Sequence, residues 1–292
     1  LLVSAIEHPS VRAGGRFAAV EEIPVTAAGL VDLGALERLL SRRQRPLVSV
    51  MLANNETGVI QPVSEVAAIV HQAGGLLHVD AVQAYGRISC KFNDMGADLV
   101  TISSHKIGGP HGAGALIKRD GVLPEPLIKG GGQERGARAG TENVASIAGF
   151  GAAAEAVAGL IGDEVTRMAA LRQRLEVGIL SIAPNAVVFG ADSPRLPNTT
   201  LFSIPGMKAE TAVIAFDLAG VAVSSGAACS SGKVAASHVL AAMGLPEELV
   251  RGAIRVSLGY SSTDDDVTAF LKAWGQLAKG LYKPTSEKEF AA

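Results

Sequence analysis

The sequence predicts an α/β protein, with a mainly parallel sheet covered by helices on both faces and a smaller α+β domain after it. Apolar, β-branched runs at residues 47–53, 76–79 and 99–102 alternate with helical patterns, and such strands suit a sheet that is buried on both faces. The chain of 292 residues is 48% hydrophobic, which is enough apolar material for a large core. The residue pattern changes after about residue 143, and this change indicates the second region.

The first half is expected to contain a strand–helix–strand unit. Between the first two apolar runs, apolar residues recur at helical spacing from residue 63 to residue 73, with Pro62 before them and Gly74 after them. Proline favours the first turn of a helix, and glycine favours its end. The crossover between the two parallel strands is expected to be right-handed.

The second half begins with an Ala-rich stretch that runs towards residue 160. The elements expected after it are a helix over residues 165–179, strands at 200–203, 221–223 and 254–257, and a helix near 210–218. Thr263 is the expected N-cap of the last helix, because three aspartates follow it in the first turn, where carboxylates favour the positive end of the helix dipole. The predicted domains are residues 1–160 and 161–292.

Composition excludes several classes of partner. With 26 basic and 28 acidic residues, the net charge of −2 gives no broad field for nucleic acid or an anionic membrane, so a small-molecule partner is expected. Two cysteines are too few for a disulfide framework. We expect no apolar run that is long enough to span a membrane. A cytoplasmic protein is predicted. The chain opens with Leu1 inside an apolar segment, and we expect a portion upstream of it.

Polar residues follow three of the predicted strands. They lie at residues 54–58, 78–83 and 103–106. In open α/β sheets, ligands bind outside the carboxyl ends of the strands. The three exits are therefore expected to converge on one crevice.

The residues at these exits meet the chemical needs of pyridoxal 5′-phosphate. This cofactor needs an amine, a carboxylate that keeps its pyridine nitrogen protonated, and polar groups for its phosphate. Lys106, Asp80 and Ser103 supply these in turn, and Gln83 could hydrogen-bond the phenolic oxygen of the ring. The prediction is that Lys106 carries the cofactor as a Schiff base.

Each of these residues also has a plainer interpretation. Lys106 could be a solvated loop residue, and Asp80 could cap the following helix. A metal site is a further alternative, with His78, Asp80, His105 and His111 as ligands. The glycine-rich segment 108–114 favours the cofactor site, because solvated loops rarely need such a close turn beside a lysine.

Taken together, these motifs resemble the cysteine desulfurases, in the class V aminotransferase branch of the pyridoxal-phosphate enzymes. The resemblance covers almost the whole chain in family order. The matching segments are 7–11 (EHPSV), 54–58 (NNETG), 78–83 (HVDAVQ), 103–106 (SSHK), 130–135 (GGGQER), 138–143 (RAGTEN), 224–229 (SSGAAC) and 254–259 (IRVSLG). The resemblance implies the fold of the pyridoxal-phosphate-dependent transferases.

The resemblance also implies roles for individual residues. His8 would stack on the cofactor ring and assist proton transfer, while Asn55 would contact the cofactor and, with Arg255, hold the substrate carboxylate. A planar guanidinium grips a carboxylate through two hydrogen bonds. Ser103 and His105 would bind the cofactor phosphate, joined by Thr141 from a second subunit. The protein is therefore expected to be a homodimer with shared active sites.

Cys229 distinguishes between reactions. It lies in a loop of small residues, of the kind that can carry a side chain into a cleft. The resemblance places the persulfide-carrying cysteine here, so the expected reaction converts L-cysteine to L-alanine and leaves a persulfide on Cys229. For Cys90 we expect only a packing role. The sulfur would pass to an acceptor or scaffold protein for iron–sulfur cluster or thiocofactor assembly.

One departure from the family is clear, and two other functions stay open. The upstream turn that binds the cofactor phosphate at a helix N-terminus in this family is absent from the chain. One alternative keeps the cofactor and changes the reaction, which gives an aminotransferase or a selenocysteine lyase. The other is a fragment without cofactor or activity that serves as a scaffold for the sulfur acceptor.

Overall fold

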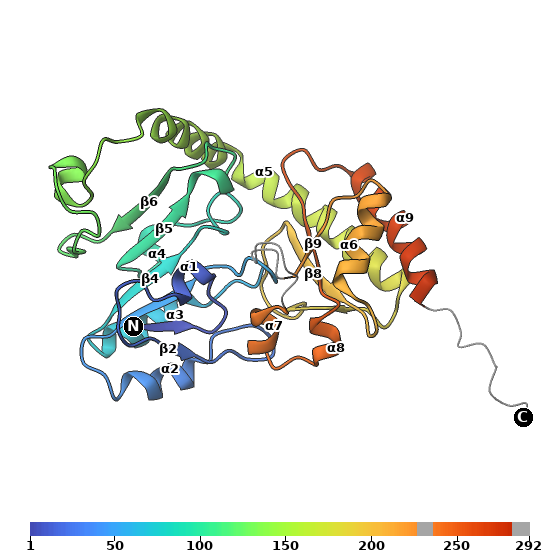
Figure 1. Cartoon of the computed structure of the whole chain (residues 1–292), viewed down its shortest axis with the longest axis horizontal. Helices are drawn as coiled ribbons and strands as arrows, with labels where there is room; N and C mark the ends of the chain where they lie inside the picture. The colour runs from blue at the N-terminus through green and yellow to red at the C-terminus, as the bar shows by residue number, and fades with distance from the viewer. Residues whose placement is uncertain (227–235, 282–292) are drawn as a thin grey trace, which may run out of the picture. The chain divides into compact units, whose positions relative to one another are not determined.

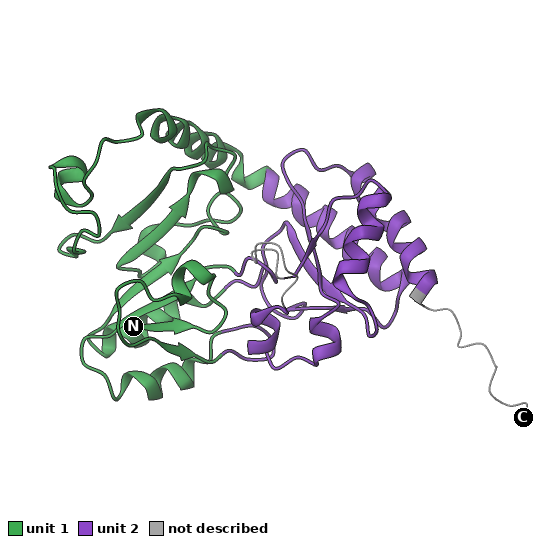
Figure 2. Ribbon diagram, in the orientation of Figure 1, with its two compact units in different colours: residues 1–24, 31–53, 61–163 green, residues 25–30, 54–60, 164–292 purple. Residues whose placement is uncertain are grey.

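The fold is described from a computed structural model in which residues 1–226 and 236–281 are described. The chain divides into two compact units (Figure 2). Unit 1 consists of Leu1–Pro24, Val31–Ala53 and Gln61–Asp163, and unit 2 consists of Val25–Leu30, Asn54–Ile60 and Glu164–Ala292. The segments 25–30 and 54–60 thus belong to unit 2, although they lie early in the sequence.

Unit 1 is built on a six-stranded sheet in the order β2-β1-β3-β4-β5-β6 (Figure 1). Its strands are β1 Leu2–Ser4, β2 Glu21–Ile23, β3 Leu47–Met51, β4 Leu76–Asp80, β5 Leu99–Ser103 and β6 Gly114–Lys118. All neighbours are parallel except β6, which runs antiparallel to β5. The predicted α/β class and the three predicted apolar strands are confirmed.

The helices of unit 1 are short except for α5. They are α1 Pro9–Arg12, α2 Leu33–Leu40, α3 Val63–Gln72, α4 Phe92–Met95, the 3-10 turns η1 Ser104–Lys106 and η2 Gln133–Gly136, and the first part of α5 Val144–Ile182. The helix predicted between β3 and β4 is confirmed as α3, and it packs on β4 with its apolar face buried. Gly74 follows it with a φ of +67°, which suits glycine.

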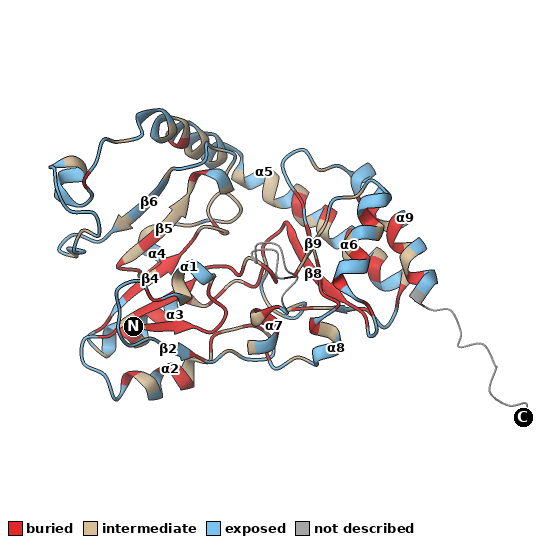
Figure 3. Ribbon diagram, viewed as in Figure 1, coloured by how far each residue is buried: buried red, intermediate tan, exposed pale blue. Residues whose placement is uncertain are grey.

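The strands β1, β3 and β4 form the buried centre of unit 1, whereas β6 and the residues after it are largely exposed (Figure 3). Val3, Val48, Val50, Leu77 and Val79 are fully buried. This rigid centre fixes the positions at which β3, β4 and β5 end.

Helix α5 is one continuous helix of 39 residues, where the sequence suggested an Ala-rich stretch followed by a separate helix. By length and composition an 18-residue stretch of it could cross a membrane, and only 6% of that stretch is buried. The expectation that no run reaches this length was wrong, because many small apolar residues add up over a long helix. One such helix is weak evidence for a membrane span.

Unit 2 carries a four-stranded antiparallel sheet in the order β7-β8-β10-β9. Its elements are β7 Val187–Val188, β8 Thr199–Ser203, β9 Ser224–Ser225, β10 Ile254–Ser257, α6 Ala209–Leu218, α7 His238–Ala242, α8 Glu247–Val250, α9 Asp264–Leu281 and the rest of α5. The predicted strands at 200–203 and 254–257 and the helix near 210–218 are confirmed. The predicted N-cap is also confirmed, since the Thr263 hydroxyl accepts from the amide of Asp266 at 3.4 Å.

The strand predicted at residues 221–223 was wrong, because only Ser224 and Ser225 pair with β10. Gly220, with a φ of +76°, ends α6, and the amide of Val221 still donates to the carbonyl of Phe216. Val221 is therefore bonded to the end of α6 rather than to a neighbouring strand.

Aromatic side chains form the core of unit 2. Phe202 meets Trp274 edge to face at 5.1 Å between ring centres, and Phe216 stacks on Phe270 at 4.9 Å. The indole N–H of Trp274 donates to the carbonyl of Ile179 in α5 at 3.2 Å. This core fastens α5, α6 and α9 to the small sheet.

Candidate active site

The exits of β4 and β5 lie side by side in unit 1. Asp80 is the last residue of β4 and pairs in register with Thr101 of β5, and Lys106 ends the turn η1 that follows β5 directly. The structure therefore brings the two predicted residues to the same edge of the sheet. Gln83, Ser103 and His105 lie on the same two exits.

Asp80 is 9% exposed, and its Oδ1 accepts a hydrogen bond from the amide of Val82 at 2.9 Å. The residues after it form a turn rather than a helix, so the carboxylate shapes the exit of β4 and does not cap a helix. Within residues 1–226 and 236–281, Oδ2 has no hydrogen bond to protein, which leaves this oxygen for a ligand.

His78 lies on the same face of β4 as Asp80, and both of its ring nitrogens are engaged. Nδ1 lies 2.7 Å from the hydroxyl of Ser49, and Nε2 lies 3.2 Å from the hydroxyl of Thr101. Burial lowers the pKa of His78, and the charge of Asp80 opposes this only in part. His78 is therefore a neutral residue that ties β3, β4 and β5 together, and the metal alternative loses one of its ligands.

Glu7 is a buried acid near Asp80 to which the sequence analysis gave no role. Its Oε1 accepts from the amide of Met51 at 2.5 Å. Burial raises the pKa of Glu7 well above its ordinary value, and the charge of Asp80 raises it further. Glu7 therefore holds its proton more tightly than an exposed glutamate does.

The exit of β5 gathers basic and hydroxyl groups. The hydroxyl of Ser103 lies 2.9 Å from Nδ1 of His105, and the ring of His105 stacks on that of His111 at 5.4 Å. The pKa of His105 is lowered, first by desolvation and then by the positive charges of Lys106 and His111. These groups suit an anion such as a phosphate.

The glycine-rich turn after Lys106 closes back on β5. The amide of Ser104 donates to the carbonyl of Ala113, and the amide of Gly109 donates to that of Ser104, both at 3.1 Å. Gly108 and Gly112 have φ values of +83° and +81°, which side chains rarely adopt. The close turn predicted beside the lysine is therefore present.

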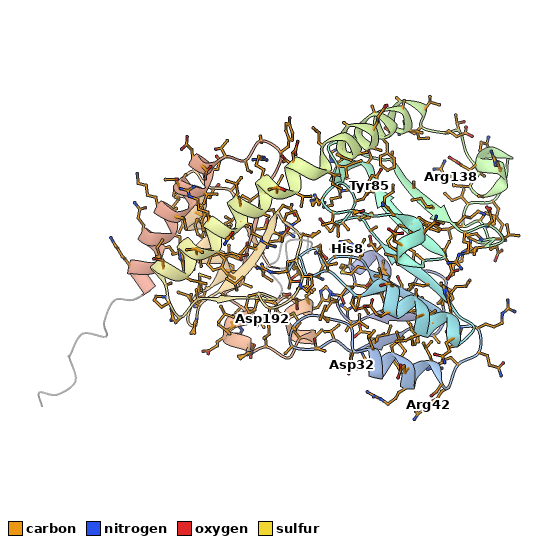
Figure 4. The ribbon with its side chains drawn as sticks, turned by 180° about the vertical axis from the view of Figure 1, so that it is seen from behind. His8, Asp32, Arg42, Tyr85, Arg138 and Asp192 are labelled. Atoms are coloured by element: carbon orange, nitrogen blue, oxygen red, sulfur yellow. The ribbon has the colours of Figure 1, made fainter. Side chains whose placement is uncertain are left out.

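Two predicted site residues of unit 1, His8 and Thr141, do not belong to the segments that follow β4 and β5. His8, labelled in Figure 4, is the N-cap of α1. Its Nδ1 accepts from the amide of Ser10 at 3.3 Å, so its Nε2 carries the proton of the neutral ring. Thr141 is exposed and lies between η2 and α5. No hydrogen bond joins either side chain to Asp80 or Lys106.

Unit 2 brings Asn55, Glu56 and Arg255 together. Nη1 of Arg255 donates to the carbonyl of Asn55 at 2.8 Å. Its Nε is buried and has no partner among the described residues, so this cation keeps donors for a further acceptor. Glu56 is 4% exposed, and its Oε2 accepts from the hydroxyl of Ser237 at 2.5 Å.

Glu56 is a second acid that the sequence analysis left without a role. Burial raises the pKa of Glu56 to about 7, against the opposing effects of Ser237 and Arg255. Its ionisation therefore changes near neutral pH, beside the guanidinium of Arg255.

The two cysteines differ in what can be said of them. Cys229 lies outside the described residues, so its predicted role stays a prediction. Cys90 is partly buried, and burial raises the pKa of its thiol to about 11. Cys90 is thus a thiol at neutral pH and a poor nucleophile, in line with the packing role expected for it.

Comparison with known proteins assigns the family. Residues 1–270 match the aminotransferase class-V model. A cysteine desulfurase of Gluconacetobacter diazotrophicus is 46% identical over 93% of this chain and 69% of its own length, and a cysteine desulfurase of Archaeoglobus fulgidus is 43% identical over 93% and 72%. The structure of a NifS-like protein from Rickettsia africae superposes with a TM-score of 0.88 at 39% identity, over 95% of this chain and 75% of that one.

The fold and these matches define a class V aminotransferase-type enzyme. Within that class, the chain belongs to the cysteine desulfurase family, whose members depend on pyridoxal phosphate. It spans about 70% of the length of the curated relatives that it matches.

The side chains at the exits of β4 and β5 fit this cofactor. Asp80 offers a carboxylate oxygen with no protein partner in the described part of the chain. Ser103 and His105 form a polar pair beside Lys106. An anionic phosphate, a pyridine nitrogen and an aldehyde would each meet a group of matching chemistry.

Proposed function

We propose that the protein converts L-cysteine to L-alanine and leaves the sulfur as a persulfide on Cys229, from which it passes to an acceptor protein for iron–sulfur cluster or thiocofactor assembly. The observation that carries the proposal is the position of Asp80 and Lys106 on adjacent strand exits. The cysteine desulfurase relatives supply the reaction.

Lys106 would hold the cofactor through its amine, and Asp80 would pair with the protonated pyridine nitrogen. The cofactor would supply an aldehyde for the amino group of cysteine and a cationic ring that accepts electrons from its α-carbon. Ser103 and His105 would hold its phosphate, and Gln83 its phenolic oxygen. Because Asp80 is buried, water would screen the attraction between its carboxylate and the pyridine nitrogen only a little.

Arg255 would grip the carboxylate of L-cysteine, with Asn55 beside it. Its Nη1 is already fixed by the carbonyl of Asn55, and this bond holds the planar guanidinium in one orientation. A guanidinium fixed in this way can present two parallel N–H donors to a carboxylate. Lys106 would remove the proton of the substrate's α-carbon as general base.

Sulfur transfer would be the task of Cys229. Its thiolate attacks the sulfur of the substrate, an S–S bond forms, and the bond between sulfur and the β-carbon breaks. The electron pair of that bond stays with the carbon part, which takes up protons and leaves as alanine. His8, whose Nε2 carries a proton in the neutral ring, is the candidate proton donor.

A homodimer is part of the proposal. Thr141 is exposed and precedes the exposed part of α5, and it would complete the phosphate site of a second subunit. Large apolar side chains of the same region, Leu127, Ile128, Val144 and Ile147, are exposed in the single chain, as expected for a surface that a subunit covers. We further propose a cytoplasmic location, on the basis of the two cysteines.

The direct test is to add L-cysteine to the purified protein with pyridoxal phosphate and to measure alanine and sulfide in the presence of a thiol. Cys229→Ala should abolish both products, whereas the matched variant Cys90→Ala should retain them. Full activity of Cys229→Ala would rule out the persulfide step. Alanine release that occurs only with selenocysteine would instead identify a selenocysteine lyase.

A further inference from the structure

We propose that Arg87 is a positioning residue that fixes the backbone of Lys106 against the exit of β4. The proposal rests on the function proposed above for Lys106. Nη1 of Arg87 donates to the carbonyl of Gln83 at 2.8 Å, and Nη2 donates to the carbonyl of Lys106 at 3.1 Å. One planar group thus joins the two strand exits that carry the candidate cofactor site.

The surroundings of Arg87 differ from those of four other arginines that donate to backbone carbonyls. Arg16, Arg119, Arg167 and Arg172 each have a carboxylate within 4.0 Å. Among the described residues, no carboxylate lies within 4.0 Å of the guanidinium of Arg87. Burial lowers the pKa of Arg87, but a guanidinium begins so high that it stays charged. The two carbonyl oxygens are therefore its main compensation for lost water.

Even partial burial of a cation is costly, so the value of Arg87 to the protein is expected to lie in the groups that it holds. The segment after Lys106 contains Gly108 and Gly109, which restrict the backbone less than other residues do. A bond to the carbonyl of Lys106 itself limits the direction in which the lysine side chain can leave the backbone. We call the two bonds from Arg87 to the carbonyls of Lys106 and Gln83 the clamp. Gln83 lies three residues beyond Asp80, which is at the buried end of β4.

Packing supports the same contact. Gly86, with a φ of +79°, lies so close to Ile107 that an added Cβ would come within 3.0 Å of the Ile107 side chain. The turn that carries Arg87 therefore lies directly against the residue after Lys106. The glycine permits this approach, and the guanidinium then bridges the two segments.

The test compares Arg87→Met and Arg87→Lys with Arg119→Met. Arg119 is a matched control, because its guanidinium also donates to two carbonyls, those of Gly96 and Ala97 before β5, at 3.2 and 3.3 Å. Methionine keeps much of the length of the side chain and removes the donors. Lysine keeps the charge but is not expected to span both carbonyls, so it should rescue only in part.

The first readout is hydrogen exchange of the cofactor-free protein. Arg87→Met should speed exchange in peptides that cover residues 81–88 and 103–113, whereas Arg119→Met should affect residues 96–98. The second readout is the dissociation constant of pyridoxal phosphate, followed through its absorption spectrum. Loss of two charge-assisted hydrogen bonds should weaken binding roughly tenfold or more in Arg87→Met, with no such change in the control.

Unchanged exchange in Arg87→Met would overturn the clamp. Faster exchange together with wild-type affinity and an unchanged spectrum would show a structural bond without a positioning role, and would overturn the proposal as well. A wild-type protein that binds no pyridoxal phosphate would contradict the proposed function, and the exchange result would still decide whether Arg87 holds Lys106 in place.

Discussion

Replacement of Glu56 by glutamine should remove a pH dependence of stability that the fold creates. Burial raises the pKa of Glu56 from 4.5 to about 7, so the folded protein binds a proton more tightly than the unfolded chain does. Its contribution to stability is fully present below pH 4.5 and is lost as the pH rises through about 7. A shift of this size corresponds to roughly 3 kcal/mol.

Glutamine keeps the shape of the side chain, and its carbonyl oxygen can still accept from the hydroxyl of Ser237. Denaturant unfolding of both proteins between pH 4.5 and pH 8 is the assay. The wild-type free energy of unfolding should fall relative to that of Glu56→Gln by roughly 3 kcal/mol over this range. The matched control is Glu248→Gln, at an exposed position of the same unit. Parallel curves for wild type and Glu56→Gln would refute the reasoning.

Three further perturbations test other parts of the molecule. Gly109→Ala should destabilise unit 1 by about 1–3 kcal/mol in thermal or denaturant unfolding, because the added Cβ would lie 2.3 Å from the Ser104 hydroxyl, and Ser104→Gly in the same chain should restore part of the loss. Trp274→Ala should cost about 3–5 kcal/mol, since the indole is fully buried and bonded to α5, and wild-type stability would contradict this packing. Arg255→Lys should lower kcat/KM for L-cysteine about tenfold or more, and an unchanged value would argue against carboxylate binding there.

Much of the fold can be predicted from the sequence, because apolar runs and helix ends carry local information. Such runs predict the strands β3, β4 and β5. Because these strands are parallel, the polar residues that follow them are predicted at one edge of the sheet. Helix α5 and residues 221–223 were predicted less well. In both places the outcome depends on where a helix ends, and packing partners decide this as much as the local residues do.

The residues that the sequence did not reveal act over long separations. Arg87 binds the carbonyl of a residue 19 positions away, Glu7 an amide 44 positions away, and Glu56 a hydroxyl 181 positions away. No local pattern marks such contacts, because the same residue types are common on exposed surfaces. The family motifs contain Glu7 and Glu56 by position, and only the burial of their carboxyl groups indicates their raised pKa values.

The most direct measurement is chemical reduction of the purified protein with borohydride in the presence of pyridoxal phosphate, followed by peptide mass mapping. Reduction makes the bond between the cofactor and its lysine permanent. The cofactor mass should appear on the peptide that contains Lys106 and should vanish in Lys106→Ala. Stable labelling of a different lysine, or no labelled peptide in a protein that is folded, would contradict the assignment of the active site.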